Sequence, residues 1–312
     1  MISILLATYN GQKFIAEQLD SLINQTFQDF IIYIKDDDSD DGTRDIIHRY
    51  VRLYPQKIRL LNQESPSGSA KANFMRLLSD STIMSDYYML CDQDDVWFPD
   101  KIQKSLDAIR KLEQTHGKET PLLVHTDLKV VNEHLESICV SFVKYQGLKP
   151  KKKKLPHLLI QNNITGCTTL FNASLRNISS LVNVEQIIMH DWWLGLAAAA
   201  FGYISFINDQ TIFYRQHPKN QIGAKSFLDI KYIIKQVKQK MINQSKYRQT
   251  SAQAKAFQNV FHDKLSLVQQ EILTNYIKLT ECKSKFIRWH IIIRYRFYMQ
   301  GAFRIIAQFF FG

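Results

Sequence analysis

The first 112 residues alternate continuous apolar runs with segments whose apolar residues recur at helical spacing. The apolar runs predict buried strands, at 2–8, 30–34, 58–61 and 87–90. Helical spacing predicts helices between and after them, from Phe14 to Ile23 and over 42–53, 70–78 and 99–112. Strands that alternate with helices build a parallel sheet with crossover helices, and ligands of such sheets bind at the carboxyl ends of the strands. The residues just after each strand are therefore the first candidates for chemistry.

The rest of the chain is expected to be less regular and then helical. Short strands are predicted near 122–126, 166–171 and 203–214, and the pattern becomes wholly helical beyond 225. A chain of 312 residues can bury a stable core without disulfides or a structural metal. The four cysteines form no CxxC pair, which argues against a zinc site or a disulfide framework and favours a reducing cytoplasm. The first residues turn polar too early for a signal peptide.

Charge is distributed unevenly along the chain. Residues 1–224 hold 24 Lys and Arg against 25 Asp and Glu, a net charge of −1, whereas residues 225–312 hold 16 against 4, a net charge of +12. A strongly basic region predicts contact with an anionic partner. We do not expect this partner to be nucleic acid, because the clustered carboxylates of the near-neutral part would repel it.

Two acidic clusters follow predicted strands, at 36–41 and at 92–95. Asp favours turns and helix N-caps, so the first cluster fits a solvated turn as readily as a binding site. The second cluster lies between the apolar segments 87–91 and 96–98, and carboxylates beside apolar surface need a cation. Mg²⁺ and Mn²⁺ are commonly bound by one or two carboxylates together with substrate phosphates. The second cluster therefore predicts a divalent metal site.

Five motifs occur in order along the chain: ATYNG at 7–11, DDDSDDGT at 36–43, CDQDDVW at 91–97, HDWW at 190–193 and YRQHPKNQIGA at 214–224. With these motifs the chain resembles glycosyltransferase family 2, and the last motif narrows the resemblance to the bacterial branch with many rhamnosyltransferases of cell-surface polysaccharide synthesis. The resemblance implies the α/β GT-A fold, a mostly parallel sheet flanked by helices. It predicts a catalytic domain over 1–224, followed by a basic amphipathic helical region over 225–312.

The resemblance also implies a site for a nucleotide-sugar donor. The loop after the first strand frames the nucleoside, and Asp37 accepts a hydrogen bond from the pyrimidine N3–H. Asp38 stands where the family usually has Gly, and Asp40 where Thr is common, which makes this turn unusually acidic. The predicted donor-binding residues are Thr8, Tyr9, Asn10, Asp36, Asp37, Lys71, Asp92 and Gln93.

Catalytic roles follow from the same resemblance. Asp92 and Asp94 resemble the acidic pair of the family, with Asp92 toward the ribose or the metal and Asp94 on the metal, which bridges the donor diphosphate. His217 either completes the metal site through a ring nitrogen or is a surface loop histidine. Asp191 resembles the catalytic base, which takes the proton of the acceptor hydroxyl as that oxygen attacks C1 from the face opposite the diphosphate. Such a displacement inverts the anomeric carbon.

The acceptor and sugar pocket is predicted from eight further residues: Asp95, Trp97, His125, Asp127, Gly166, Cys167, His190 and Trp192. Core or supporting roles stay open for Trp97, Trp192 and His190. Gly166 lets the backbone approach the substrate closely. Cys167 is not expected to act as a nucleophile, because an inverting transferase needs none.

Residues 286–310, placed on one helical wheel, gather Ile, Tyr and Phe side chains in one arc and most basic residues on the other side. Such a helix either packs on the catalytic domain or lies on an anionic membrane surface, and the charge of +12 over 225–312 favours the membrane. The Lys151–Lys154 run is either a solvated loop or a contact for anionic lipid or a lipid-linked diphosphate. Uncharged stretches of the C-terminal region are too short to span a bilayer.

These observations predict an inverting, metal-dependent glycosyltransferase that associates peripherally with the cytoplasmic face of the cell membrane. dTDP-L-rhamnose is the preferred donor, Mn²⁺ or Mg²⁺ the cofactor, and a lipid-linked oligosaccharide of capsule, O-antigen or cell-wall synthesis the acceptor. A UDP-hexose or UDP-N-acetylhexosamine donor is the first alternative. A sugar nucleotidyltransferase is the second, although ATYNGQKF lacks the Gly-rich basic loop that such an enzyme needs. A homodimer also stays open.

Overall fold

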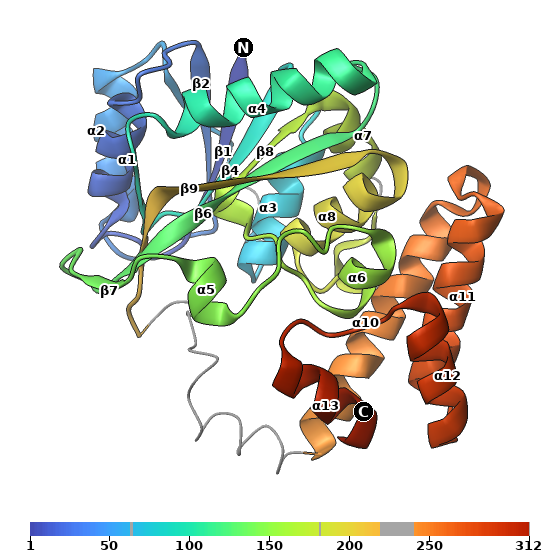
Figure 1. Cartoon of the computed structure of the whole chain (residues 1–312). Helices are drawn as coiled ribbons and strands as arrows, with labels where there is room; N and C mark the ends of the chain where they lie inside the picture. Colours follow the sequence, from blue (N-terminus) through green and yellow to red (C-terminus); the bar gives the residue numbers. More distant parts are fainter. Residues whose placement is uncertain (63–64, 181, 219–239, 312) are drawn as a thin grey trace.

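One sheet organises the computed structural model, which describes residues 1–62, 65–180, 182–218 and 240–311. Its strands lie in the order β3-β2-β1-β4-β8-β6-β9-β5, and β7 pairs with β6 (Figure 1). The strands are β1 (Ile2–Thr8), β2 (Phe30–Asp36), β3 (Ile58–Leu60), β4 (Tyr87–Cys91), β5 (Val96–Trp97), β6 (Leu122–Val131), β7 (Ser137–Cys139), β8 (Thr169–Asn172) and β9 (Tyr203–Arg215). The helices are α1 (Ile15–Ile23), α2 (Thr43–Leu53), α3 (Ala70–Ser79), α4 (Lys101–His116), α5 (Phe142–Gln146), α6 (Leu155–Ile160), α7 (Ala173–Ser179), α8 (His190–Phe201), α10 (Lys240–Val260), α11 (Leu267–Glu281), α12 (Lys285–Tyr295) and α13 (Ala302–Phe311).

The first four strands form a parallel half-sheet, as predicted. β1 pairs with β2 on one side and with β4 on the other, and β3 extends the sheet beyond β2. The strands and helices predicted for the first 112 residues are all present. α4 begins at Lys101 rather than at Pro99, because Lys101 N–H donates to the Phe98 carbonyl oxygen (3.1 Å) and closes a turn before the helix.

The remaining strands run in both directions. β8 lies antiparallel between β4 and β6, β9 lies parallel to β6, and β5 pairs antiparallel with β9. The strand predicted at 166–171 is shorter than expected, since Gly166–Thr168 forms a 3₁₀ turn before β8. The α/β class is confirmed, and the antiparallel pairs are confined to the second half of the sheet.

Both faces of the sheet are buried, which explains the continuous apolar runs. Successive side chains of a strand point to opposite faces. In β1, Leu5 and Ala7 join the core on one face, whereas Ile4 and Leu6 join the core on the other. A strand covered on both sides is therefore apolar at most positions, and the two polar residues of β1, Ser3 and Thr8, are buried and hydrogen-bonded.

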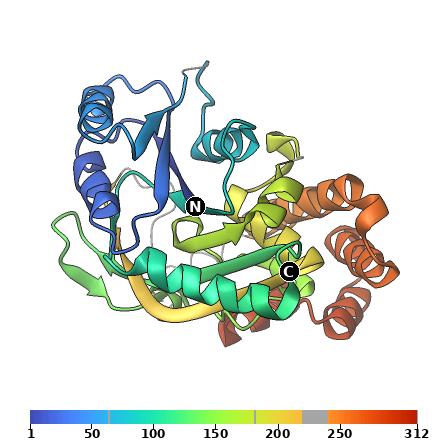
Figure 2. The same cartoon turned by 90° about the horizontal axis from the view of Figure 1, so that it is seen from above.

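The C-terminal helices pack on the same core as α8. Figures 1 and 2 place them on the side of the molecule opposite α1 and α2. The Trp193 ring of α8 lies 5.1 Å from Phe257 and 5.8 Å from Phe261 of the C-terminal region, measured between ring centroids. The predicted domain boundary at 224 and the end of the last motif, 219–224, lie outside the described residues and stay predictions.

The prediction of one helix over 286–310 is wrong. α12 ends at Tyr295 because Arg296 adopts a left-handed conformation (φ 58°), and α13 begins only after Gly301 (φ 97°). Ile291 and Ile292, from the predicted membrane-facing arc, are buried in the core instead. None of the helices in the described ranges is both long enough and apolar enough to cross a membrane.

Candidate functional site

A cavity of about 1560 Å³ opens at the carboxyl ends of β1, β2 and β4, where a parallel sheet is expected to bind ligands. Its wall combines the loop after β1 with the segments after β2 and β4, the loop before β8, the start of α8 and the end of β9. Twelve predicted site residues line it: Thr8, Tyr9, Asn10, Asp37, Asp92, Gln93, Asp94, Gly166, His190, Asp191, Trp192 and His217. The fold therefore brings most of the predicted site together.

Gln93 fixes the loop that follows β1. Its side-chain amide donates to the carbonyl oxygen of Tyr9 (2.8 Å) and accepts from the Tyr9 N–H (2.9 Å). Gly11 leaves room for this contact, since a Cβ there would lie 2.3 Å from Gln93 Oε1. The Tyr9 side chain stays 57% exposed at the cavity, where its ring is available to a ligand.

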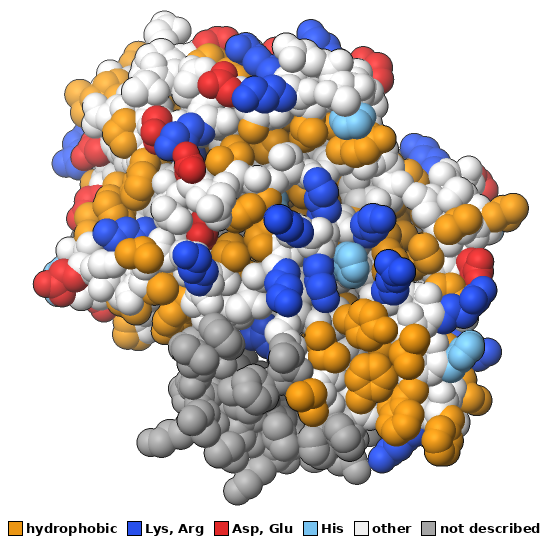
Figure 3. Space-filling view, viewed as in Figure 1, with side chains coloured by type: hydrophobic (Ala, Val, Ile, Leu, Met, Phe, Trp, Pro, Cys, Tyr) orange, Lys and Arg blue, Asp and Glu red, His pale blue; other side chains and the backbone are white. Residues whose placement is uncertain are grey.

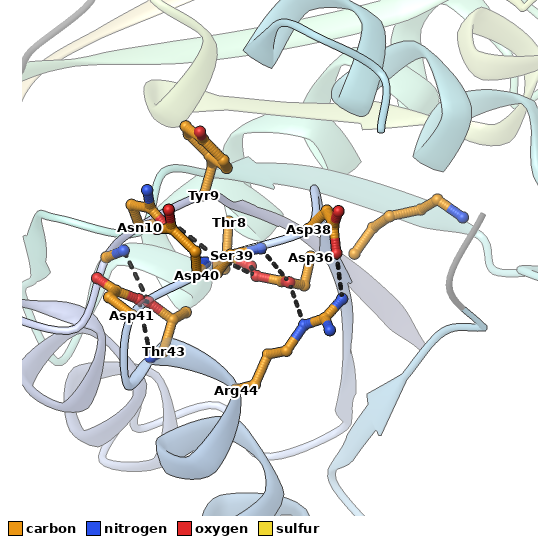
Figure 4. A network of polar contacts seen from close by, with 12 residues as sticks. Thr8, Tyr9, Asn10, Asp36, Asp38, Ser39, Asp40, Asp41, Thr43 and Arg44 are labelled. Carbon is orange, nitrogen blue, oxygen red and sulfur yellow. Dashed lines mark hydrogen bonds and ion pairs between the residues drawn. The ribbon is translucent and has the colours of Figure 1, made fainter. Parts of the chain in front are cut away.

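The segment 36–41, here called the acidic turn, is held by hydrogen bonds within the turn and to neighbouring residues (Figure 4). The Asp36 carboxylate accepts from Thr8 Oγ1 (2.8 Å), from the Ser39 N–H (3.0 Å) and hydroxyl (2.6 Å), and from Arg44 Nε (2.8 Å). Burial would raise the pKa of Asp36, but these hydrogen bonds, led by Ser39 and Arg44, hold the pKa below its usual value. Asp36 lies behind the cavity wall, so the prediction that it touches the donor nucleotide is not supported.

Two residues next to the cavity have left-handed backbones, Asn10 (φ 48°) and Asp38 (φ 67°). Asn and Asp are the residues other than Gly that tolerate this conformation best. The Asp40 N–H donates to Asn10 Oδ1 (3.0 Å), which joins the loop after β1 to the acidic turn. The backbone at Asp38 also explains why glycine suits that position.

Asp37 is the member of the acidic turn's Asp36–Asp38 run that lines the cavity. Its carboxylate oxygens accept from the backbone N–H groups of Ser67 (2.5 Å) and Gly68 (3.1 Å). A carboxylate has about four lone-pair sites, so Asp37 can still accept from a ligand N–H. Lys71, predicted to bind the donor, instead donates to the Ile187 carbonyl oxygen (3.0 Å) and is absent from the described cavity wall.

The segment 92–95, here called the acidic segment, has few protein donors for its charge. Burial, then the neighbouring Asp94 and Asp191, raise the pKa of Asp92 to about 7. Asp94 Oδ2 lies 2.8 Å from His217 Nε2, and the His217 ring packs against Phe14 with ring centroids 4.9 Å apart. Carboxylates in such surroundings gain from binding a cation.

Arg215, which the sequence analysis did not single out, anchors the acidic segment to the end of β9. Its side chain is 1% exposed. The Arg215 N–H donates to Asp95 Oδ1 (3.1 Å), and its Nε donates to the Asp94 carbonyl oxygen (2.9 Å). His217 follows two residues later, so Arg215 ties the backbone that carries His217 to the acidic segment. Its place two residues before that histidine in the last motif is the sequence signal that could have identified it.

The residues on the wall fit a hard divalent cation. Asp92, Asp94 and His217 offer carboxylate oxygens and an imidazole nitrogen, donors that suit Mn²⁺. The group of described residues whose ligand atoms all lie within 4.8 Å of one another is a different one: Asp92, Asp95 and Cys167. Asp95 and Cys167 are buried, however, and burial raises the pKa of the Cys167 thiol, so it stays protonated and is a poor ligand for such a cation. The first group is therefore the better candidate.

Asp191 lies in the first turn of α8, across from the acidic segment. Its carboxylate accepts from the Gly166 N–H (3.0 Å) and from Asn162 Nδ2 (3.1 Å). Burial nevertheless raises the pKa of Asp191 to about 6. A carboxylate with a pKa in this range can accept a proton near neutral pH. The sequence analysis missed Asn162, which lies four residues before the predicted site residue Gly166.

Gly166, His190 and Trp192 form the wall around Asp191. A Cβ at position 166 would lie 2.9 Å from His190 Nε2, so glycine allows the close approach here. The His190 ring stacks on Phe74 with centroids 4.2 Å apart, and burial lowers its pKa to about 3, which keeps it neutral. Trp192 Nε1 donates to the Leu158 carbonyl oxygen (2.5 Å). His190 and Trp192 thus line the cavity and are also held by the core.

Five residues predicted for the acceptor pocket lie in the core instead: Asp95, Trp97, His125, Asp127 and Cys167. Each is at most 2% exposed. Asp127 accepts from the Ser141 hydroxyl (2.5 Å) and the Val143 N–H (3.1 Å), and so holds the start of α5. His125 packs beside Phe206, and burial lowers its pKa to about 3. None of the five lines the cavity.

Comparison with known sequences identifies relatives that cover most of the chain. Residues 3–118 match the family described as glycosyl transferase family 2. The dTDP-rhamnosyl transferase RfbG of Shigella flexneri is 31% identical over 235 residues, which cover 73% of this chain and 76% of RfbG. The UDP-Glc:alpha-D-GlcNAc-diphosphoundecaprenol beta-1,3-glucosyltransferase WfgD of Escherichia coli is 24% identical over 233 residues, 74% of this chain and 83% of WfgD.

Solved structures share the fold. S. aureus TarS 1-349 in complex with UDP-GlcNAc matches with a TM-score of 0.56 at 15% identity, over 92% of this chain and 82% of that one. The mannosyltransferase PcManGT from Pyrobaculum calidifontis, in complex with GDP-Man and Mn²⁺, matches with a TM-score of 0.51 at 13% identity, over 94% of this chain and 73% of that one. These likenesses confirm the GT-A fold with helices at its C-terminal end.

Proposed function

The chain belongs to glycosyltransferase family 2. We therefore propose that it transfers the sugar of a nucleoside-diphosphate sugar to an acceptor hydroxyl, with inversion at the anomeric carbon. One observation carries this proposal: Asp37, the Asp94–His217 pair and Asp191 line a single cavity. Asp37 offers an acceptor for an N–H of the nucleobase, the Asp94–His217 pair offers a cation site, and Asp191 offers a proton acceptor.

The donor is proposed to be a dTDP-sugar, with dTDP-L-rhamnose preferred. The identity with a dTDP-rhamnosyl transferase supports this choice. Asp37 would accept the pyrimidine N3–H, and the exposed Tyr9 ring lies on the same wall. Thymine and uracil present the same N3–H edge, so a UDP-hexose or UDP-N-acetylhexosamine is the alternative, supported by WfgD and by TarS with UDP-GlcNAc.

A divalent cation, Mn²⁺ or Mg²⁺, is proposed to be held by Asp92, Asp94 and His217. When bound, it would offset the negative charge of the donor diphosphate. Arg215 holds the backbone of Asp94, so the acidic segment is in place before any ligand arrives. The structure with GDP-Man and Mn²⁺ shows that a protein of this fold binds such a cation with its donor.

Asp191 is proposed to be the general base. The acceptor oxygen attacks C1, the bond from C1 to the diphosphate oxygen breaks, and the hydroxyl proton passes to the Asp191 carboxylate. Asn162 and the Gly166 N–H orient that carboxylate, and burial keeps its pKa at about 6, close enough to neutrality for proton transfer. The acceptor is proposed to be a lipid-linked saccharide, as the name of WfgD describes for that enzyme.

Thermal unfolding with a panel of nucleotide sugars tests the function. A cognate donor at 100 times its dissociation constant should stabilise the protein by about 2.7 kcal/mol, provided that Mn²⁺ or Mg²⁺ is present. dTDP-rhamnose is expected to give the largest shift, followed by UDP-sugars. A parallel assay mixes a nucleoside triphosphate with a sugar 1-phosphate. Release of pyrophosphate there, without stabilisation by any nucleotide sugar, would overturn the proposal in favour of a nucleotidyltransferase.

A further inference from the structure

Basic side chains gather between the cavity and the C-terminal helices (Figure 3). We call this group the basic rim: Lys149, Lys151, Lys152, Lys154 and Arg296. All are exposed except Lys152, which is half-buried. His157 lies among them, and after burial the charges that lower its pKa are Lys152, Lys154 and Arg296. The rim therefore joins the loop after α5 to the turn after α12.

The basic rim has no internal counter-charge within the described ranges. No carboxylate there forms an ion pair with any of its five members. The pKa of Lys152 is lowered, first by burial and then by Lys149. Like charges at such spacing repel one another, so an external anion would relieve the repulsion.

Hydrogen bonds hold the basic rim in place and connect it to the cavity. Asn163 Nδ2 donates to the carbonyl oxygens of Lys149 (3.0 Å) and Lys152 (3.1 Å), and Asn163 itself lines the cavity. The Lys149 N–H donates to Gln300 Oε1 (2.6 Å) in the turn between α12 and α13. On either side of the lysine run, Leu148 and Gln161 line the cavity. The rim is thus an ordered edge of the site.

Exposed apolar side chains continue the surface beyond the basic rim. Figure 3 shows hydrophobic side chains beside the basic ones on this face. On α12, Phe286 is 79% exposed and Ile293 is 57% exposed, and Ile306 on α13 is 54% exposed. Lys152 Nζ lies 6.0 Å from the centre of the Tyr298 ring, where the two kinds of surface meet. Basic groups beside exposed aromatic and aliphatic groups are typical of proteins that rest on a membrane surface.

We propose that the basic rim and the exposed apolar side chains of α12 and α13 form a docking surface for an anionic lipid bilayer. The lysines and Arg296 meet lipid phosphates, and the apolar side chains enter the boundary between headgroups and acyl chains. The inference rests on the proposed function, because a lipid-linked acceptor would then reach the cavity across its own basic edge. It keeps three lysines of the Lys151–Lys154 run as lipid contacts, and its apolar part comes from two helices rather than from one helix over 286–310.

Vesicle flotation with the full chain tests the docking surface. Wild-type protein is mixed with vesicles of phosphatidylglycerol and phosphatidylcholine, or of phosphatidylcholine alone. The triple variant Lys151→Gln, Lys152→Gln, Lys154→Gln should partition onto the anionic vesicles on the order of 100-fold more weakly, about fivefold for each charge. Lys153 is left unchanged because its Nζ donates to the Ile204 carbonyl oxygen (2.5 Å).

A matched control removes three charges elsewhere. Arg52, Lys111 and Lys118 are exposed and lie on α2, on α4 and just after α4. The variant with all three changed to Gln should lose at most a few-fold in partition, because the charges lie outside the docking surface. Phe286→Ser with Ile293→Ser should remove the binding that persists at high salt, since salt screens the lysines but not the apolar contact.

The outcomes separate this inference from the proposed function. Nucleotide-sugar stabilisation is measured on the same variants and should be unchanged. If the rim variant binds anionic vesicles as tightly as the matched control, or if wild type binds neutral vesicles equally well, the docking surface is overturned while the function stands. If the rim variant alone loses binding to anionic vesicles, the docking surface is supported even where no nucleotide sugar stabilises the protein.

Discussion

The acidic turn and the carboxylates of the cavity wall have the same chemistry in opposite surroundings. In the acidic turn, Asp36 accepts hydrogen bonds from Thr8, Ser39 and Arg44, and the pKa of Asp36 is lowered. On the cavity wall, the pKa values of Asp92 and Asp191 are raised to about 7 and about 6, with burial as the main cause. The comparison teaches that a carboxylate is a candidate for binding a cation or a proton only where the protein leaves its charge uncompensated.

The largest expected effect comes from removing the charge of Asp191. Asp191→Asn should reduce the transfer rate by about 10²–10⁴, the usual contribution of a general base, and leave nucleotide-sugar binding nearly unchanged. Single-turnover transfer and equilibrium binding of the donor measure the two quantities separately. A collapse of donor affinity with a high residual rate would show that Asp191 is a binding residue and not a base.

The pH dependence of transfer should follow the raised pKa of Asp191. The base must be ionised, so the rate should fall about tenfold per pH unit below about pH 6 and level off above it. Transfer rates measured at saturating donor between pH 4.5 and 8 should show this decline on the acidic side, beginning at about pH 6. A wild-type rate that stays constant down to pH 5 contradicts the assignment, as does a decline that persists in Asp191→Asn.

Stability should change in opposite directions in the two regions. Asp36→Asn removes a charged acceptor from Ser39 and Arg44 and should lower the free energy of unfolding by about 2 kcal/mol at pH 7.5. Because the folded-state pKa of Asp36 is lowered, its contribution is present above its usual pKa of 3.8 and is lost as the pH falls through the lowered value.

At Asp191 the pH dependence of the free energy of unfolding has the opposite sign. The folded-state pKa of Asp191, about 6, lies above the usual 3.8, so the stability that Asp191 contributes is lost as the pH rises from about 4 to about 6. Asp191→Asn should therefore raise the free energy of unfolding by about 1–2 kcal/mol at pH 7.5. Urea unfolding of both variants at pH 5 and pH 7.5 tests the comparison, and a change of the same sign in both would break it.

The smallest effect is expected at Asp38. Its left-handed backbone suits glycine, but Asp38→Gly also removes a half-exposed ion pair with Arg44 and adds freedom to the unfolded chain. These contributions offset one another, so the free energy of unfolding should change by less than about 1 kcal/mol. A loss well above this value in urea unfolding would mean that Asp38 supports the acidic turn more strongly than its contacts indicate.

Much of the fold was predictable because its local patterns agree with its tertiary structure. β1 is buried on both faces, and a strand of this kind is apolar at most positions. Gly301 before α13 was a signal that the single helical wheel over 286–310 overlooked. The end of α12 was not predictable, because nothing in the residue type of Arg296 ends a helix. Its left-handed conformation follows from the packing of the segment after α12, where the Phe297 side chain is fully buried.

The candidate site was predictable where a motif follows a strand, as for Asp37 and Asp94. It was not predictable within strands, where neighbouring positions face opposite sides, and so Asp127 was assigned to the pocket although it lies in the core. Arg215 and Asn162 were missed because they act through distant contacts. Arg215 donates a hydrogen bond to Asp94, which lies 121 positions away in the sequence, and Asn162 donates one to Asp191, which lies 29 positions away.

The central claim is that the acidic segment, and not the acidic turn, binds a divalent cation together with the donor. Equilibrium titration of dTDP with Mn²⁺ or with a chelator tests it in wild type, in Asp94→Asn and in the matched variant Asp40→Asn, which removes one exposed charge from the acidic turn. Wild type and Asp40→Asn should bind dTDP about 10–100-fold more tightly with Mn²⁺, and Asp94→Asn should lose that gain. The same gain from Mn²⁺ in Asp94→Asn would contradict the account.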